Sequence, residues 1–189
     1  MTVRPPLGGI VLARHGETND NRQPIRVQGF TNTPLNDTGR AQAAELAERI
    51  ASGPPFGALW SSDLSRARET AEIVGTRVGL EPKLDARLRE ANRGRWEGHR
   101  FIDIEREEPE LYAAWRRAGT EFRFPGGESL LDQQERVTAA LSDIHAAGKL
   151  PALVVCHGGS IRVMLCAGDP RGLDAFHEFD VPNVAVFPL

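Results

Sequence analysis

The sequence predicts an α/β fold: a three-layer αβα sandwich with a mostly parallel central sheet and a small helical cap insertion. Short runs of continuous apolar residues, such as IVLA at 10–13 and ALVVC at 152–156, alternate with longer amphipathic segments. Strands that lack polar alternation are typical of parallel sheets covered by helices on both faces. We expect one domain over residues 1–189, with a cap and specificity insertion at about 92–128.

The first half of the chain is expected to supply two strand–helix pairs. Residues 8–13 and 56–62 are short apolar runs that predict strands. Residues 37–52 and 64–79 have apolar positions at helical spacing and predict amphipathic helices. A further strand is expected within 82–90, running into a loop at its end.

The second half is expected to contain, in order, a helical segment at 100–118, a loop at 122–129, a long helix at 128–148, a strand at 151–156, a helix at 159–168 and a last strand at 183–188. Pro109 should kink the first of these helices, because proline interrupts helical hydrogen bonding. Ser129 should cap the long helix.

Composition excludes several classes of protein. The 23 basic and 26 acidic residues give a net charge of −3, so we expect no nucleic-acid partner. No apolar run approaches the ~18 residues of a membrane span, and residues 1–16 do not resemble a signal peptide. We therefore expect no membrane association and a cytoplasmic location. Cys156 and Cys166 have no CxxC spacing and should be buried small hydrophobic residues.

Two strands end in the same unusual way. The strand at 8–13 is followed by Arg14, His15 and Gly16, and the strand at 151–156 by His157 and Gly158. Because ligands of such folds bind beyond the carboxyl ends of the strands, both histidines should lie over one edge of the sheet. Glycines there allow close backbone approach. An arginine beside a histidine favours an anion, and a guanidinium suits a phosphoryl group.

Other chemistries lack their motifs. The five histidines are dispersed, with no HxH, HExxH or His-Cys cluster, so we expect no metal. There is no GxxxxGK[ST] loop, GxGxxG loop or GxSxG elbow, and we expect no cofactor. A histidine nucleophile in an anion pocket remains. A neutral imidazole can attack phosphorus and form a phosphohistidine.

The segments RHGET, SSDLSRARETAEIV, LREANRGRWEG, PGGES and VVCHGGSIR, in that order, resemble the histidine phosphatase superfamily, also called phosphoglycerate-mutase-like. The resemblance covers nearly the whole chain. It implies that His15 is the phosphorylated nucleophile and that Glu90 is the proton donor. Arg14, Arg66 and His157 would complete the cage around the phosphoryl group.

The same resemblance assigns Asn21, Gln28 and Gly158 to phosphate or substrate binding. Arg68 competes with Arg66 for the inward position. The helix there has an apolar stripe formed by Leu64, Ala67, Ala71 and Val74. The family pattern aligns Arg66, so Arg66 is expected to face the site.

The short cap and the GRWEG segment favour the phosphatase branch of this family. A cofactor-dependent phosphoglycerate mutase and a non-catalytic phosphoester-binding module remain alternatives. The partner should be a small-molecule phosphate ester, and the chain a monomer or homodimer. The substrate stays open among a sugar acid phosphate, a nucleotide and α-ribazole phosphate. Candidate specificity residues are Arg93, Arg95, Trp96, His99, Phe101, Tyr112, Trp115, Arg116, Phe122, Arg123 and Phe124.

Overall fold

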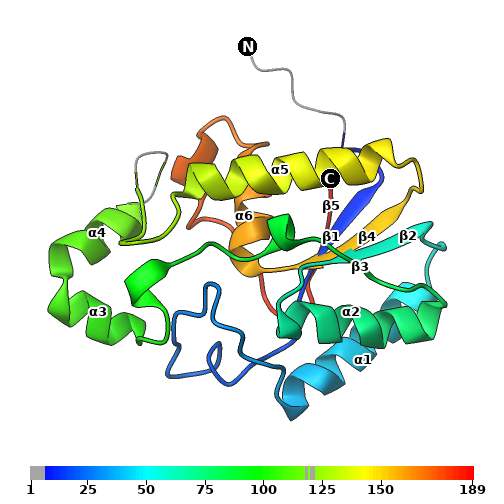
Figure 1. Cartoon of the computed structure of the whole chain (residues 1–189), viewed down its shortest axis with the longest axis horizontal. Coiled ribbons are helices and arrows are strands. Elements are labelled where there is room, and N and C mark those ends of the chain that lie inside the picture. The colour runs from blue at the N-terminus through cyan, green and yellow to red at the C-terminus, as the bar shows by residue number, and fades with distance from the viewer. Residues whose placement is uncertain (1–6, 118, 120–121) are drawn as a thin grey trace.

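The computed structural model describes residues 7–117, 119 and 122–189. Residues 1–6, part of the stretch expected not to be a signal peptide, lie outside the described residues, as do 118 and 120–121 of the predicted cap. The five strands are β1 (Ile10–Arg14), β2 (Ala58–Ser61), β3 (Lys83–Leu84), β4 (Ala152–Cys156) and β5 (Val186–Pro188). They form one sheet in the order β3-β2-β4-β1-β5, in which only β5 is antiparallel to its neighbour (Figure 1).

The register of the two central strands brings the two histidines together. In the parallel pair of β1 and β4, Ile10 lies opposite Ala152 and Arg14 opposite Cys156, so both strands end at the same level. The next residues along the two strands are His15 and His157. The predicted shared edge is therefore confirmed.

Two helical layers cover the sheet and make it the three-layer sandwich that was predicted. The helices are α1 (Asp37–Ala51), α2 (Ser65–Val78), α3 (Phe101–Glu107), α4 (Pro109–Arg117), α5 (Leu130–Ala146) and α6 (Gly158–Cys166). One face packs Leu153 against α1 and α2. The opposite face packs Leu12 against α5 and α6, which lie across the sheet from α1 and α2 in Figure 1.

The cap forms a second hydrophobic core beside the sandwich. Helices α3 and α4 and the 3-10 turn Gly94–Trp96 pack around Trp96 and Trp115, whose rings meet edge to face with centroids 6.0 Å apart. This core joins the cap to α6 through Val163 and Cys166. The cap therefore packs directly on the helix that begins at the site.

Some local expectations were wrong in extent. Pro109 starts a new helix instead of kinking one, and Glu108 between the two helices has non-helical dihedral angles, because a residue before proline is driven away from the α region. The strand expected within 82–90 is confirmed as Lys83–Leu84, two residues long. It ends because the Asp85 carboxylate accepts from the Arg87 N–H and starts a 3-10 turn. The last strand begins at Val186, later than expected.

Other local expectations are confirmed. Ser129 caps α5 through a reciprocal pair of hydrogen bonds with Asp132. Cys156 and Cys166 are buried, and burial raises the pKa of these thiols to about 12 and about 11. Within the described ranges, no helix is long and apolar enough to cross a membrane.

Candidate active site

His15 stands at the end of β1 with its tautomer set by the backbone. Its side chain is buried, and its Nδ1 lies 2.7 Å from the carbonyl oxygen of Gly16. A carbonyl only accepts hydrogen bonds, so Nδ1 carries the proton and Nε2 keeps its lone pair. The loop is tight at this point, because a Cβ on Gly16 would lie 2.3 Å from the carbonyl oxygen of Gly39.

His157 stands at the end of β4, at the N-terminus of α6, and uses its ring in the opposite way. Its Nε2 lies 2.8 Å from the Ser62 hydroxyl oxygen, which accepts a hydrogen bond from the Leu64 N–H. Among the described residues the buried Ser62 hydroxyl has no other acceptor for its own hydrogen, so that hydrogen is directed to Nε2 and the proton of the neutral His157 ring is on Nδ1. That Nδ1 is buried and has no partner among the described residues. The rings of His15 and His157 are 5.1 Å apart between centroids.

Two arginines flank the histidines, the buried Arg66 and the half-buried Arg14. Arg66 donates to the carbonyls of Gly29 and Thr31, each at 2.8 Å, and Arg14 donates to the Val181 carbonyl at 2.6 Å. The Nε atoms of Arg14 and Arg66 are buried without a partner in the described part of the chain. These carbonyl contacts hold the guanidinium groups in place and leave a donor on each for a ligand.

The burial of Arg66 confirms it as the inward arginine of the RAR segment. Arg66 is fully buried, whereas Arg68 is exposed and pairs with Glu72 on the helix surface. Burial lowers the pKa of both Arg14 and Arg66 to about 10, so both stay charged at neutral pH.

Burial and the two arginine charges keep both histidines neutral. For His15, burial, then Arg66, then Arg14 hold the pKa well below 6.5. For His157, burial, Arg66 and His15 have the same effect on its pKa. Uncharged imidazoles beside fixed positive charges suit a site that binds an anion and attacks it with a nitrogen lone pair.

Glu90 lies across from the histidines and is held by three N–H donors. Oε1 accepts from the Ala91 N–H at 2.9 Å and from the Gln133 amide at 3.0 Å, and Oε2 accepts from the Gly159 N–H at 2.9 Å. A Cβ on Gly159 would lie 2.0 Å from Oε1 of Glu90. A side chain at 159 would therefore displace the Glu90 carboxylate from this position.

Gly158 does not have the tight environment that the sequence suggested. A Cβ there would lie 3.5 Å from Nε of Arg14, which is an ordinary contact distance. The close backbone approach expected at Gly158 is therefore made at Gly159. Gly158 still lines the pocket described below.

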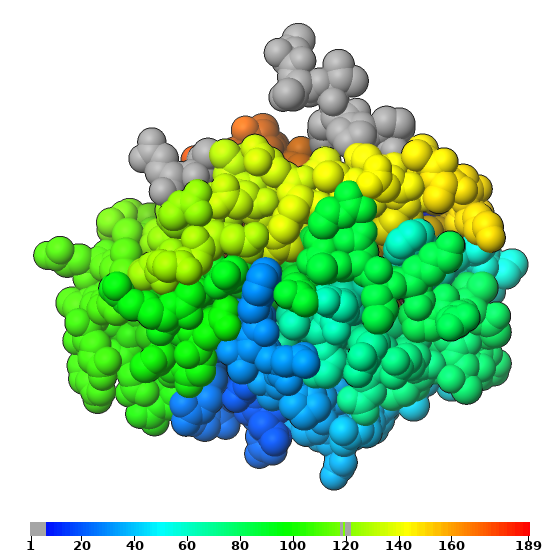
Figure 2. Space-filling model, viewed as in Figure 1, coloured from blue at the N-terminus to red at the C-terminus, as the bar shows by residue number. Residues whose placement is uncertain are grey.

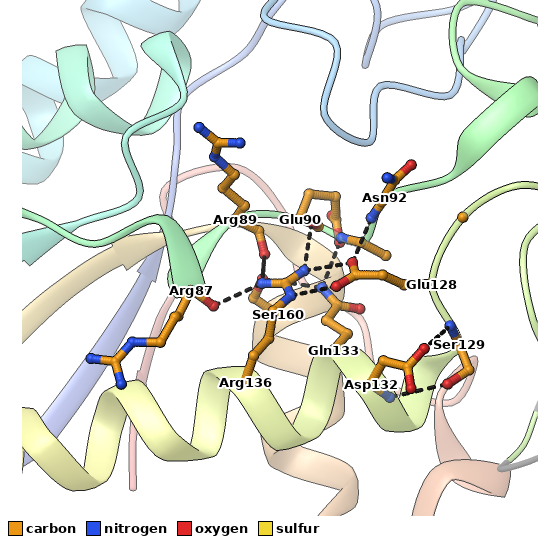
Figure 3. A network of polar contacts seen from close by, with 12 residues as sticks. Arg87, Arg89, Glu90, Asn92, Glu128, Ser129, Asp132, Gln133, Arg136 and Ser160 are labelled. Carbon is orange, nitrogen blue, oxygen red and sulfur yellow. Dashed lines mark hydrogen bonds and ion pairs between the residues drawn. The ribbon is translucent and has the colours of Figure 1, made fainter.

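A network anchored on α5 positions the Glu90 segment (Figure 3). Arg136 uses all five of its N–H groups, donating to carbonyls within 87–90 and to both oxygens of Glu128. Glu128 in turn accepts from the Asn92 N–H at 2.7 Å. The backbone on both sides of the Glu90 carboxylate is thereby fixed to a rigid helix.

The pKa of Glu90 is about 2 in this setting. Burial alone would raise that pKa, but the charge of Arg93 and the N–H donors of Gly159, Ala91 and Gln133 outweigh it. Glu90 is therefore ionised at neutral pH. Negative charge that enters the site raises this pKa and favours the protonated carboxyl.

A pocket of about 420 Å³ opens beside these groups and contains both residues predicted in the loop after β1. Asn21 accepts from the Thr18 N–H at 3.0 Å through Oδ1, and its Nδ2 is buried without a partner among the described residues. Gln28 donates from Nε2 to the Thr18 hydroxyl. Figure 2 shows this loop, in blue, against the green cap segment, where Val27 donates to the His99 carbonyl.

The cap contributes only part of the predicted specificity set to this pocket. The predicted specificity residues that line the pocket are Arg93, Phe101, Tyr112, Trp115 and Arg116. The remaining candidates serve the cap itself: Trp96, Phe122 and Phe124 are in its core, His99 is exposed, and Arg95 and Arg123 form ion pairs with Glu108 and Asp132.

Several residues of the site were not predicted from the sequence. Ser62 follows β2 at the same edge as the histidines, so the rule that located the histidines could have found it. Gln133 on α5 has no local signal. Asn183 donates to the His15 carbonyl at 2.9 Å. Among the described residues, no group of three or more His, Cys, Asp or Glu side chains could hold a metal ion.

Comparison with known proteins identifies the family of this chain. Residues 10–189 match the model of the histidine phosphatase superfamily, branch 1. The chain belongs to this superfamily and is an enzyme of the phosphatase type.

The relatives include both phosphatases and mutase-like proteins. Phosphoglycerate mutase-like protein 4 of Arabidopsis thaliana is 39% identical over 158 residues, which cover 81% of this chain and 67% of the relative. Glucosyl-3-phosphoglycerate phosphatase of Mycolicibacterium vanbaalenii is 36% identical over 166 residues, covering 84% and 72%. The structure of a mycobacterial glucosyl-3-phosphoglycerate phosphatase in complex with VO3 has a TM-score of 0.83 and 32% identity, covering 94% of this chain and 88% of that one.

Proposed function

We propose that this chain is a metal-independent phosphomonoesterase that hydrolyses a small phosphorylated metabolite through a phosphohistidine on His15. The observation that carries the proposal is the state of the His15 ring. Its proton is held on Nδ1 by the Gly16 carbonyl, and its pKa is kept well below 6.5 by burial, Arg66 and Arg14. Nε2 is therefore an unprotonated nucleophile at neutral pH, beside two fixed cations that attract a phosphoryl group.

The first step transfers the phosphoryl group to the enzyme. Nε2 of His15 forms a bond to phosphorus while the bond from phosphorus to the ester oxygen breaks. Arg14, Arg66 and the Nδ1–H of His157 balance the charge on the equatorial oxygens, which is the main source of catalysis in phosphoryl transfer. Asn21, Gln28 and Gly158 complete the binding surface.

Glu90 protonates the leaving alkoxide in the first step. The bound phosphoryl dianion raises the Glu90 pKa, and the carboxylate takes up the proton that it donates from solvent or from the monoanionic ester when the substrate binds. In the second step water attacks phosphorus, the bond to His15 breaks, and Glu90 takes a proton from the water. Inorganic phosphate leaves, Glu90 releases this proton to the departing phosphate or to solvent, and both residues return to their starting states.

The comparisons support a small phosphorylated metabolite as substrate. One relative is named a glucosyl-3-phosphoglycerate phosphatase, and its solved counterpart from mycobacteria binds VO3 at 32% identity to this chain. Vanadate has the charge and oxygen geometry of a phosphoryl group in transfer. We infer that this chain hydrolyses a phosphorylated metabolite similar in size to glucosyl-3-phosphoglycerate.

The test is hydrolysis of p-nitrophenyl phosphate in EDTA by the wild type and by His15→Ala. We expect turnover by the wild type alone. Turnover that EDTA abolishes and one divalent metal restores would contradict the metal-free mechanism. Parallel reactions should contain 3-phosphoglycerate with 2,3-bisphosphoglycerate, because one relative is named mutase-like. Release of inorganic phosphate is expected, and interconversion of phosphoglycerates would indicate a mutase.

A further inference from the structure

The pocket has more positive charge than a phosphoryl group needs. In the described part of the chain, its charged lining consists of one carboxylate, Glu90, and five arginines, Arg14, Arg26, Arg93, Arg116 and Arg162. A phosphate monoester carries about two negative charges at neutral pH. Only Arg14 of these five belongs to the phosphoryl cage described above. The remaining positive charge raises the local concentration of ligands with further negative charge.

Arg93 is the most unusual of these arginines. It is 8% exposed, its guanidinium lies over the Phe124 ring at 4.9 Å from the centroid, and its Nη2 is 4.0 Å from Oε1 of Glu90. Its Nη1 is buried and has no hydrogen-bond partner among the residues that the structure describes. Buried donors of charged groups are almost always paired, so this N–H calls for an acceptor. The pocket that Arg93 lines is where a ligand can supply one.

Two neighbours extend this donor set. The Trp115 indole N–H is also buried without a partner in the described ranges, and Trp115 lines the same pocket. Arg162 is anchored by a hydrogen bond to the Phe179 carbonyl at 2.9 Å. Arg14, Arg93 and Arg162 all line this pocket, and, after burial, the charge of Arg162 lowers the pKa of the other two.

We propose that Arg93, Arg162 and the Trp115 indole N–H form a second anion subsite, so that the substrate is a phosphomonoester with a second anionic group. That group is a carboxylate or another phosphate, since a guanidinium binds either through paired N–H donors. The proposal rests on the proposed function for the identity of the first anion. Phe101 and Tyr112 line the same pocket and offer apolar surface to the carbon skeleton that joins the two anions.

Matched substrate pairs test the subsite. 3-Phosphoglycerate and sn-glycerol 3-phosphate differ in a carboxylate, and fructose 1,6-bisphosphate and fructose 6-phosphate differ in a phosphate. We expect the wild type to favour the more anionic member of at least one pair by about 10- to 100-fold in kcat/KM, the value of one charged hydrogen bond. The pair that shows the preference identifies the second anion.

The variant Arg93→Gln should bring this ratio close to one, mainly through KM. Arg95→Gln is the matched control, because Arg95 lies two residues away, is exposed, and pairs with Glu108 outside the pocket. The control should keep the wild-type ratio. Ratios near one for both pairs in the wild type, or an unchanged preference in Arg93→Gln, would overturn the subsite while leaving the phosphatase proposal intact.

Binding separates this proposal from the proposed function. Calorimetric titration of His15→Asn with 3-phosphoglycerate, sn-glycerol 3-phosphate and the two fructose phosphates requires no turnover. Tighter binding of the more anionic member of a pair, lost on adding Arg93→Gln, supports the subsite. Equal dissociation constants within both pairs overturn it. If the wild type hydrolyses none of the esters, the proposed function fails and titration of the wild type decides the subsite in the same way.

Discussion

The ends of β1 and β4 look alike in sequence but differ in chemistry. Each is a buried strand followed by a histidine and a glycine, and in the sheet the two histidines stand side by side. His15 donates its Nδ1–H to a backbone carbonyl, which leaves the Nε2 lone pair available. His157 accepts a hydrogen bond from Ser62 at Nε2, which leaves its Nδ1–H available. One ring is therefore left as a nucleophile and the other as a donor.

The difference shows that position alone does not assign a catalytic role. Both rings are buried, neutral and close to Arg66. What distinguishes them is the ring nitrogen whose hydrogen bond the structure describes, Nδ1 in His15 and Nε2 in His157. Variants that remove a ring or its hydrogen-bond partner test this difference between His15 and His157 directly.

Removing the two rings should have unequal consequences. His15→Ala removes the nucleophile, so kcat for p-nitrophenyl phosphate should fall by at least about 10⁴-fold. His157→Ala removes one donor to the equatorial oxygens and should cost about 10²- to 10³-fold. Steady-state kinetics with folded protein checks both values. Similar residual activity in the two variants would contradict the roles of His15 as nucleophile and His157 as donor.

Glu90→Gln should separate leaving groups. The loss in kcat/KM should be about 10²- to 10⁴-fold for an alkyl phosphate such as sn-glycerol 3-phosphate, because its alkoxide must be protonated. For p-nitrophenyl phosphate, whose leaving group needs little protonation, the first step should be nearly unaffected, and a pre-steady-state burst of nitrophenol measures it. Equal losses for both esters in that first step would remove Glu90 from the role of proton donor.

Ser62→Ala should act through the tautomer of His157. Without the hydroxyl, Nε2 of His157 no longer has its hydrogen bond, and the proton is no longer held on Nδ1. We expect kcat to fall by about 10- to 100-fold, the value of one hydrogen bond to a charged group. Ser61→Ala is the matched control, because the Ser61 hydroxyl donates to the Ser62 carbonyl and not to the ring.

The measurement for Ser62 is kcat together with the ¹⁵N chemical shifts of the His157 ring, which report the tautomer. The control should retain both wild-type values. A Ser62→Ala protein with full activity and an unchanged ring tautomer would contradict the role assigned to the hydroxyl.

The smallest effect is on stability. The pKa of His15 and that of His157 are depressed in the folded state, so below pH 6.5 the unfolded chain binds protons that the folded chain does not. The free energy of unfolding therefore has its full value above pH 6.5 and decreases as the pH falls below 6.5. Between pH 6.5 and 5, each imidazole should cost up to about 2 kcal/mol of unfolding free energy.

Urea unfolding of the wild type and of His157→Asn at pH 7 and pH 5 measures this cost. The variant should lose less stability over that interval than the wild type. An identical loss in both proteins would show that His157 does not titrate differently in the folded and unfolded chains.

The sequence predicted the parts of the site that depend on strand order and on the family pattern. The shared edge of His15 and His157 follows from two apolar runs in a parallel sheet, a local pattern with a direct spatial meaning. The apolar stripe of the helix at 64–79, whose members are all buried, follows from helix periodicity. The choice of Arg66 over Arg68 came from the resemblance to the family.

The remaining features depend on tertiary contacts without a local pattern. In RGR, Arg93 and Arg95 look equivalent, yet one packs on Phe124 beside the pocket and the other pairs with Glu108 at the surface. Gly158 and Gly159 are likewise adjacent glycines, and only the position of Glu90 shows which one must lack a side chain. The antiparallel direction of β5 also cannot be read from its three residues.

The most direct test of the account is to locate the phosphoryl group on the enzyme. Wild-type protein is mixed with p-nitrophenyl phosphate and quenched in base, where phosphohistidine survives. Peptides are then analysed by mass spectrometry, and the attached nitrogen by ³¹P NMR of the quenched protein. The account predicts a phosphoryl group on Nε2 of His15, and none on His157. Phosphorylation of His157, attachment to Nδ1 of His15, or turnover without any phosphohistidine would contradict it.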